Sequence, residues 1–162
     1  HAVSPTTVRR YLEILEALYV VFVIQPWHRN IGRSLLQAPK VYFYDTGLVA
    51  SDEGVRFENA VAVMLRKHAH YIQDTTGRET GLHYIRTKDG AEIDFCMSSE
   101  SELTHLVECK SADNTLHRAL VRFAAPFPRA QAVQVVRNLR QTEFRQGVDI
   151  TYAGEWLSRL AA

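Results

Sequence analysis

The sequence predicts an α/β fold in which helices flank a central mixed sheet, preceded by a short helix and a hairpin. Four segments have apolar residues at helical spacing, and eight are rich in β-branched or alternating apolar residues, as strands are. Turn residues such as Asp-Gly and Thr-Gly separate several of them. The order of helix, three or four antiparallel strands, helix and strand favours one sheet with helices packed on its faces.

Composition limits the class of protein. The chain has 162 residues, 46% of them hydrophobic and 23% charged, which fits about one globular domain with a small appendage. Its longest apolar run has 8 residues, far short of the ~20 needed to span a bilayer. Cys96 and Cys109 lie in strand-like segments, which indicates free thiols in a reducing compartment. We therefore expect a cytoplasmic protein that does not enter membranes.

The first 50 residues form the first predicted unit. Ser4 is a suitable N-cap and Pro5 suits the first helical position, so a helix should run to about Leu18. Two strands follow, separated by a long loop: Tyr19–Ile24, the loop Gln25–Pro39, and Lys40–Tyr44. A helix followed by a hairpin is the back half of a winged helix, so we expect a partial winged-helix segment at residues 1–50.

Basic residues of this segment are candidates for DNA contact. Arg9 and Arg10 lie near the helix start, where a recognition helix meets base edges, and Arg29 and Arg33 lie in the hairpin loop. Arg86, farther along the chain, is a candidate phosphate contact. Because the net charge is only +1, DNA binding would depend on such local patches. The alternative is a packing helix and hairpin with solvated arginines.

Residues 51–162 are the second predicted unit. A helix is expected from Gly54 to about His68, and Lys88-Asp89-Gly90 suits a hairpin turn. The remaining expected strands are His70–Gln73, Leu82–Thr87, Ala91–Met97, Thr104–Lys110, Ala132–Val136 and Val148–Thr151. Two further helices are expected at Asn114–Phe123 and Gly154–Leu160.

Three charged residues are expected to meet on the sheet. Alternation places Asp94 on one face of its strand, and Glu108 and Lys110 share a face because they are two residues apart. A five-residue loop, Ser98–Glu102, would pair Asp94 with Leu106, which makes Asp94 and Glu108 diagonal neighbours about 7–8 Å apart. Both carboxylates and the lysine would then point the same way.

Two carboxylates on adjacent strands can bind a hard cation. Mg²⁺ or Mn²⁺ fits oxygen ligands better than zinc does, and such an ion activates water and stabilises charge on a phosphate. Lys110 could orient that water or neutralise the added charge. The alternative is a solvated ladder of strand charges without chemistry.

Asp94 followed after a hairpin by Glu108-Cys109-Lys110 resembles the motif of the PD-(D/E)xK nuclease superfamily. In that motif Ile93 stands where the family name has proline. Glu58, on the helix before the sheet, is similar to the additional acidic residue of the Holliday-junction-resolvase-like branch. The resemblance implies a restriction-endonuclease-like core with Glu58, Asp94, Glu108 and Lys110 as its catalytic site and the three carboxylates as metal ligands.

A second resemblance covers nearly the whole chain. The segments Pro39–Leu48, Arg56–Asn59 and Glu92–Phe95 resemble a domain of unknown function in the C-terminal part of prokaryotic AAA-type ATP-binding proteins. It implies that an ATPase domain precedes this segment in a longer polypeptide. The chain lacks a G-x-x-x-x-G-K-[S/T] loop, so no ATP site is expected within it.

Two functions remain open from the sequence. The first is a metal-dependent DNA endonuclease. The second is a catalytically silent domain of the same fold that binds DNA or docks a partner. The residue patterns leave the oligomeric state open.

Overall fold

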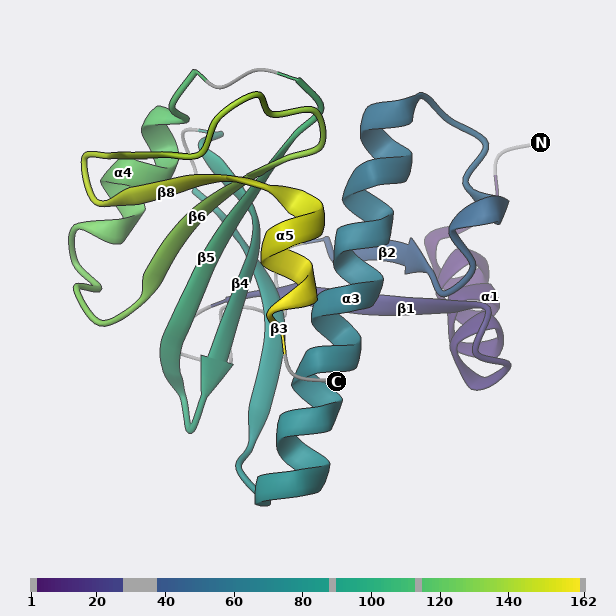
Figure 1. Cartoon of the computed structure of the whole chain (residues 1–162). Coiled ribbons are helices and arrows are strands. Elements are labelled where there is room, and N and C mark those ends of the chain that lie inside the picture. Colours follow the sequence, from purple (N-terminus) through teal and green to yellow (C-terminus); the bar gives the residue numbers. More distant parts are fainter. Residues whose placement is uncertain (1–2, 28–37, 88–89, 113–114, 161–162) are drawn as a thin grey trace.

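The structure, a computed structural model, describes residues 3–27, 38–87, 90–112 and 115–160. Within them, eight strands form one mixed sheet in the order β2-β1-β3-β4-β5-β6-β8-β7 (Figure 1). Neighbours pair antiparallel except for β1–β3, β5–β6 and β6–β8, which are parallel. The strands are β1 (Val21–Pro26), β2 (Lys40–Phe43), β3 (Thr80–Arg86), β4 (Glu92–Ser99), β5 (Glu102–Lys110), β6 (Gln131–Val136), β7 (Glu143–Arg145) and β8 (Val148–Tyr152). The expectation of a mixed sheet flanked by helices is confirmed.

Helices cover both faces of this sheet. On one face lie α3 (Glu53–Thr76) and α5 (Ala153–Ser158), and on the other lies α4 (Arg118–Ala124) (Figure 1). Each face has its own core cluster. Val61 and Leu65 of α3 and Trp156 of α5 pack in the first cluster, and Leu120 of α4 packs in the second. Burial of these apolar side chains on both sides holds the sheet in three layers.

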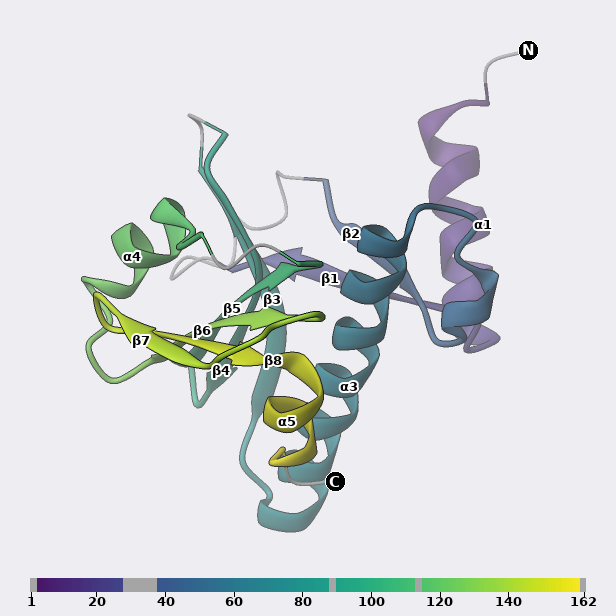
Figure 2. The same cartoon turned by 45° about the horizontal axis from the view of Figure 1, so that its top comes forward.

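The first 50 residues share this sheet and its core. The helix and hairpin expected there are α1 (Pro5–Ala17), β1 and β2, with Ser4 capping the amide of Thr7. Strand β1 pairs with β3, and Phe22 and Ile24 belong to the same core cluster as α3. Helix α1 lies beside the β1–β2 edge, away from the other helices (Figure 2). The hairpin loop between residues 28 and 37 lies outside the described residues.

Helix α3 is much longer than expected. It begins after Asp52, which accepts a hydrogen bond from the amide of Val55, and ends at Gly77 in the left-handed conformation (φ 71°). The strand expected at His70–Gln73 is wrong, because these residues form part of this helix. Ala69 continues the buried helical stripe onto the sheet, so tertiary packing overrides the β-branched and aromatic character of the short segment.

The β4–β5 hairpin has a different loop from the one expected. Ser99 pairs with Glu102, so the turn contains only Glu100 and Ser101, both with positive φ, and a register shift leaves Thr104 as an extra residue. Without that bulge, a two-residue turn would reverse the face of every later β5 residue relative to β4. The bulge therefore decides which residues of β5 can meet those of β4.

A second irregularity lies in β4 itself. The register with β3 shifts between His83 and Ile85, so β4 has one extra residue at Asp94–Phe95. Phe95 packs in the α3 cluster, whereas Ile93 packs in the α4 cluster. The expected alternation along β4, with these two residues on one face, is therefore wrong. Asp94 lies at the break in alternation.

Other differences from the expected elements are small. Strand β7 was not expected; it is a three-residue edge strand joined to β8 through Gln146 and Gly147, both with positive φ. In the part of the chain that the structure describes, no helix is both long and apolar enough to cross a membrane.

Candidate active site

A pocket of about 320 Å³ lies where the beginning of α3 meets β4 and the end of β5. It brings together the four residues expected to form the catalytic site. The lining contains Glu58, Asp94, Glu108 and Lys110. The other lining residues come from the α3 start and from the end of β5, namely Asp52, Gly54, Val55, Phe57, Cys109 and Ser111. Carboxylates from three elements thus line one cavity.

Glu58 is held by β2. Its Oε1 accepts hydrogen bonds from the Tyr42 hydroxyl (2.6 Å) and from Nζ of Lys40 (3.2 Å). Burial, then the charge of Glu58, raises the pKa of Tyr42, so its hydroxyl remains a donor. The next residue, Asn59, exchanges two hydrogen bonds with the backbone of Phe43 and fixes α3 against β2. Glu58 therefore lines the pocket with the other two carboxylates, but Lys40 and Tyr42 already donate hydrogen bonds to it.

Lys40 is a site residue that the sequence did not reveal. Its Nζ lies 2.6 Å from Oε1 of Glu92, 3.2 Å from Oε1 of Glu58 and 3.6 Å from Oδ1 of Asp94. The side chain is only 16% exposed. Burial opposes its charge, but the carboxylates of Glu58, Glu92 and Asp94 outweigh burial and raise the pKa of Lys40. The ammonium group is therefore a fixed cation among three carboxylates.

Asp94 lies where β4 and β5 stop pairing. The register ends at Phe95 opposite Val107, and Oδ2 of Asp94 accepts the hydrogen bond of the Cys109 amide at 2.9 Å. Burial, with the negative charges of Glu108 and Glu58, raises its pKa to about 7. The carboxyl of Asp94 thus takes the place of a backbone acceptor and lies in the field of two like charges.

Glu108 is the most buried carboxylate of the site. Its side chain is 6% exposed, and Oε1 lies 2.9 Å from Nζ of Lys110 and 3.3 Å from Nδ1 of His117. Its other oxygen, Oε2, is buried and has no hydrogen-bond partner among the described residues. Burial raises the pKa of Glu108, an effect that Lys110 opposes. A buried acceptor without a partner is costly, and a bound cation or its water would satisfy it.

His117, which the sequence did not reveal either, is positioned by a buried amide. Gln134 of β6 is fully buried, and its Oε1 accepts a hydrogen bond from the His117 amide while its Nε2 donates to the carbonyl of Thr115. This fixes the segment before α4 against Glu108. Asp94 contacts Lys40 of β2 and the Cys109 amide, whereas Glu108 contacts His117 at the start of α4. Val107 and Cys109, on either side of Glu108, pack with the α3 cluster, so Glu108 points toward the opposite face of the sheet. The expectation that Asp94 and Glu108 point the same way is therefore wrong. Both carboxylates nevertheless line the same pocket.

The donor set fits a hard cation bound through few protein ligands. Among the described residues, no group of three or more histidine, cysteine or acidic side chains is arranged to hold a metal ion by itself. Mg²⁺ commonly keeps several waters and takes only one or two carboxylates from the protein. The unsatisfied Oε2 of Glu108 and the raised pKa of Asp94 both identify places where positive charge would be stabilising. Asp94 and Glu108 are therefore the residues that fit such an ion.

The raised pKa of Asp94 predicts a pH-dependent stability of the metal-free protein. Its pKa is about 7 in the folded state against 3.8 for an unperturbed aspartate, so the folded state binds this proton more tightly. Protonation of Asp94 therefore stabilises the folded state. This contribution is complete below pH 3.8 and is lost as the pH rises through 7. We expect the free energy of unfolding in EDTA to fall between pH 5 and pH 8, by an order of 2–4 kcal/mol from this group.

Urea unfolding of wild type and Asp94→Asn at each pH measures this contribution. The asparagine variant cannot titrate at this position. Its unfolding free energy minus that of wild type should therefore rise with pH, because only wild type loses the contribution of protonated Asp94. Histidine titration elsewhere cancels in this difference. A constant difference from pH 5 to pH 8 would show that the folded-state pKa of Asp94 is not raised.

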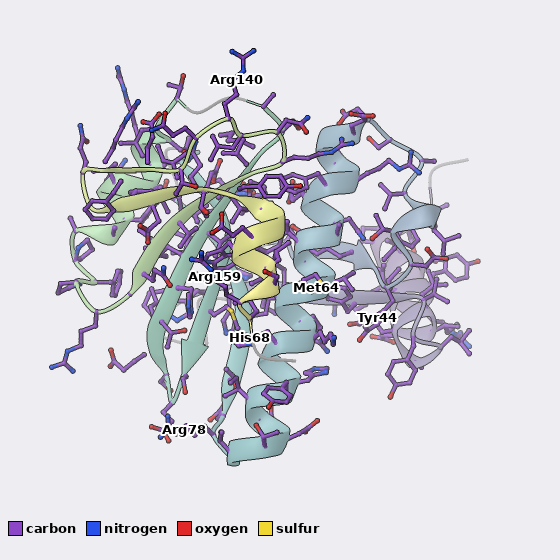
Figure 3. All side chains as sticks on the ribbon, viewed as in Figure 1. Tyr44, Met64, His68, Arg78, Arg140 and Arg159 are labelled. Atoms are coloured by element: carbon purple, nitrogen blue, oxygen red, sulfur yellow. The ribbon has the colours of Figure 1, made fainter. Side chains whose placement is uncertain are left out.

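The expected DNA-contact residues do not gather at this pocket. Arg9 and Arg10 are exposed on α1, and Arg29 and Arg33 lie outside the described residues. Arg86 pairs with Glu92 at 2.6 Å, beside the pocket. Arg140, in the loop after β6, points outward into solvent (Figure 3).

The fold and the pocket define a mixed α/β protein with a buried acidic site. Residues 53–156 match the family described as a domain of unknown function (DUF4143), and residues 1–58 match another domain of unknown function (DUF8612). Because the first match covers more than half of the chain, this protein belongs to the DUF4143 family. Of the pocket residues, Asp94, Glu108 and Lys110 lie in the segment matched by this family alone, and Glu58 lies in residues 53–58, which both matches cover. Lys40, which contacts Glu58 and Asp94, lies in the segment matched by the other family alone.

Two curated relatives are uncharacterized proteins of mycobacteria, Mb2031c of Mycobacterium bovis and Rv2008c of Mycobacterium tuberculosis. Each is 32% identical over 99 residues, which is 57% of this chain and 22% of the relative. The matched segment thus spans about a fifth of the length of these relatives. No solved structure matches the chain.

Proposed function

We propose that this protein is a metal-dependent DNA endonuclease domain that hydrolyses phosphodiester bonds with Mg²⁺ or Mn²⁺. The main support is that Glu58, Asp94, Glu108 and Lys110 line one pocket. Within that pocket Glu108 has a buried oxygen without a partner. Such an arrangement of like charges is stabilised by a cation and is expensive without one.

The order of elements supports a restriction-endonuclease-like core. Helix α3, the antiparallel strands β3, β4 and β5, helix α4 and the parallel strand β6 follow one another as this core requires. The pair Glu108 and Lys110 lies at the end of the third of these strands, as the PD-(D/E)xK resemblance implies. The same resemblance implies an AAA-type ATPase domain in the full polypeptide as a partner of this one.

The four predicted site residues have different roles in the proposed reaction. Asp94 and Glu108 would hold the ion, which lowers the pKa of a bound water and offsets charge on the scissile phosphate. Lys110 is 31% exposed, so its ammonium can reach both Glu108 and a phosphate oxygen entering the pocket. Glu58 holds Lys40 and the Tyr42 hydroxyl in place.

A second function, a catalytically silent domain for DNA binding or partner docking, is favoured by one observation. Lys40 already neutralises part of the acidic cluster, so the fold is stabilised there without an added ion. A silent domain would retain this ion pairing and would bind no divalent cation.

Cleavage assays separate the two functions. The protein is incubated with labelled duplex and four-way-junction DNA in EDTA, Mg²⁺ or Mn²⁺. We expect cleavage only with the divalent cation. DNA binding that persists in EDTA, with no cleavage of either DNA in either metal, would support the silent domain and reject the endonuclease.

A further inference from the structure

We infer that Lys40 is a built-in cation of the acidic pocket, so that the site takes one divalent ion, at Asp94 and Glu108, and not two. This inference deepens the proposed function and depends on it for the identity of the ion. Lys40 acts through the carboxylates that it contacts and is therefore a positioning residue.

The ammonium group of Lys40 lies among three carboxylates and two aromatic rings. Nζ of Lys40 contacts Glu58, Glu92 and Asp94 within 3.6 Å, which is the way a cation is surrounded by oxygen ligands. It also lies 5.6 Å from the ring centre of Tyr84 and 6.0 Å from that of Phe95. The two rings and three carboxylates fix the charge without the mobility of a surface lysine.

The charges of the site do not cancel among its own side chains. The ion pairs of the site join four carboxylates to three cationic groups, namely Glu58, Glu92, Asp94 and Glu108 with Lys40, Arg86 and Lys110. These groups leave one negative charge, and Asp52, which also lines the pocket, adds a second. A single divalent ion would neutralise that remainder. A second divalent ion would have to displace Lys40.

The hydrogen-bond acceptors of the site are not equally satisfied. Both Lys40 and Tyr42 contact Oε1 of Glu58, and Lys40 and Arg86 each take one oxygen of Glu92. The buried oxygen without a hydrogen-bond partner among the described residues is Oε2 of Glu108, which Lys40 does not contact in the described ion pairs. A cation would therefore be stabilised most on the Asp94–Glu108 side of the pocket.

The number of Mn²⁺ ions bound per chain tests this inference without measuring activity. Mn²⁺ is titrated into the metal-free protein and counted by electron paramagnetic resonance of the free ion. We expect one ion for wild type. In Lys40→Met, which keeps an unbranched apolar side chain beside Tyr84 and Phe95, we expect two ions. The charge-retaining Lys40→Arg should bind one, and Lys67→Met, an exposed position on α3, serves as the matched control and should also bind one.

Each outcome is decisive. Two ions in wild type, or one ion in Lys40→Met, would overturn the inference. If Lys40→Met fails to fold, the wild-type and Lys40→Arg counts still decide, because two ions in either contradict it. Should wild type bind no ion, the endonuclease proposal fails by itself. Mn²⁺ binding by Lys40→Met would then still support Lys40 as the resident cation. If Lys40→Met also bound no Mn²⁺, that role of Lys40 would be rejected.

Discussion

Asp94→Asn is expected to abolish metal-dependent DNA cleavage, with a rate loss of roughly 10³-fold or more. An amide oxygen binds a hard cation far more weakly than a carboxylate does, and Asp94 is one of the two residues that fit the ion. The substitution is nearly isosteric, and the amide oxygen can still accept the hydrogen bond of the Cys109 amide. The fold around the β4–β5 junction should therefore persist.

The measurement is the single-turnover rate of cleavage in Mn²⁺, with DNA binding followed separately by fluorescence anisotropy. DNA affinity should change little, because phosphate contacts outside the pocket supply most of it. Asp149→Asn is the matched control: Asp149, on β8, pairs with Gln131 and is not part of the pocket. Retention of more than a tenth of the wild-type rate by Asp94→Asn would exclude Asp94 as a metal ligand.

Lys110→Ala is expected to reduce the cleavage rate by roughly 10²–10³-fold, the usual scale for one charge-stabilising group. Mn²⁺ should still bind, since both carboxylates remain. Lys110 also opposes the rise in the pKa of Glu108, so its removal raises that pKa further. Metal affinity should therefore become more dependent on pH, weakening on the acid side, where Glu108 takes up a proton.

Two readouts identify this role. The rate is measured at saturating Mn²⁺, and Mn²⁺ affinity is measured across pH 6 to pH 8. Lys110→Arg keeps the charge and should recover part of the rate, whereas Lys67→Ala on α3 should match wild type. An unchanged rate in Lys110→Ala would remove the lysine from the mechanism, whatever its effect on metal binding.

Local patterns in the sequence were sufficient for most of the sheet. The strands β3, β5, β6 and β8 appear close to where the spacing of apolar residues predicts them. Short apolar segments were ambiguous, as at residues 70–73, because the choice between strand and helix there depends on packing against the sheet and not on the residues themselves.

Four residues of the candidate site were predicted from the sequence, but their geometry was not. Asp94, Glu108 and Lys110 line one pocket, yet the expected loop and the expected alternation along β4 are both wrong. Two β-bulges, at Thr104 and at Asp94–Phe95, set the actual register. A bulge adds one residue to a strand without a distinctive residue type, so counting along the sequence cannot find it.

The sequence by itself determined the mixed sheet, the helices that flank it and the acidic residues with the lysine that follows them. Only the tertiary structure decided that Lys40 lies among these carboxylates, because the pairing of β1 with β3 carries the β1–β2 hairpin to the site from a distant part of the chain. The same holds for His117 and the buried Gln134 that positions it. Charge interactions depend on distance and burial, and both are set by strands and helices that are remote in sequence but adjacent in space.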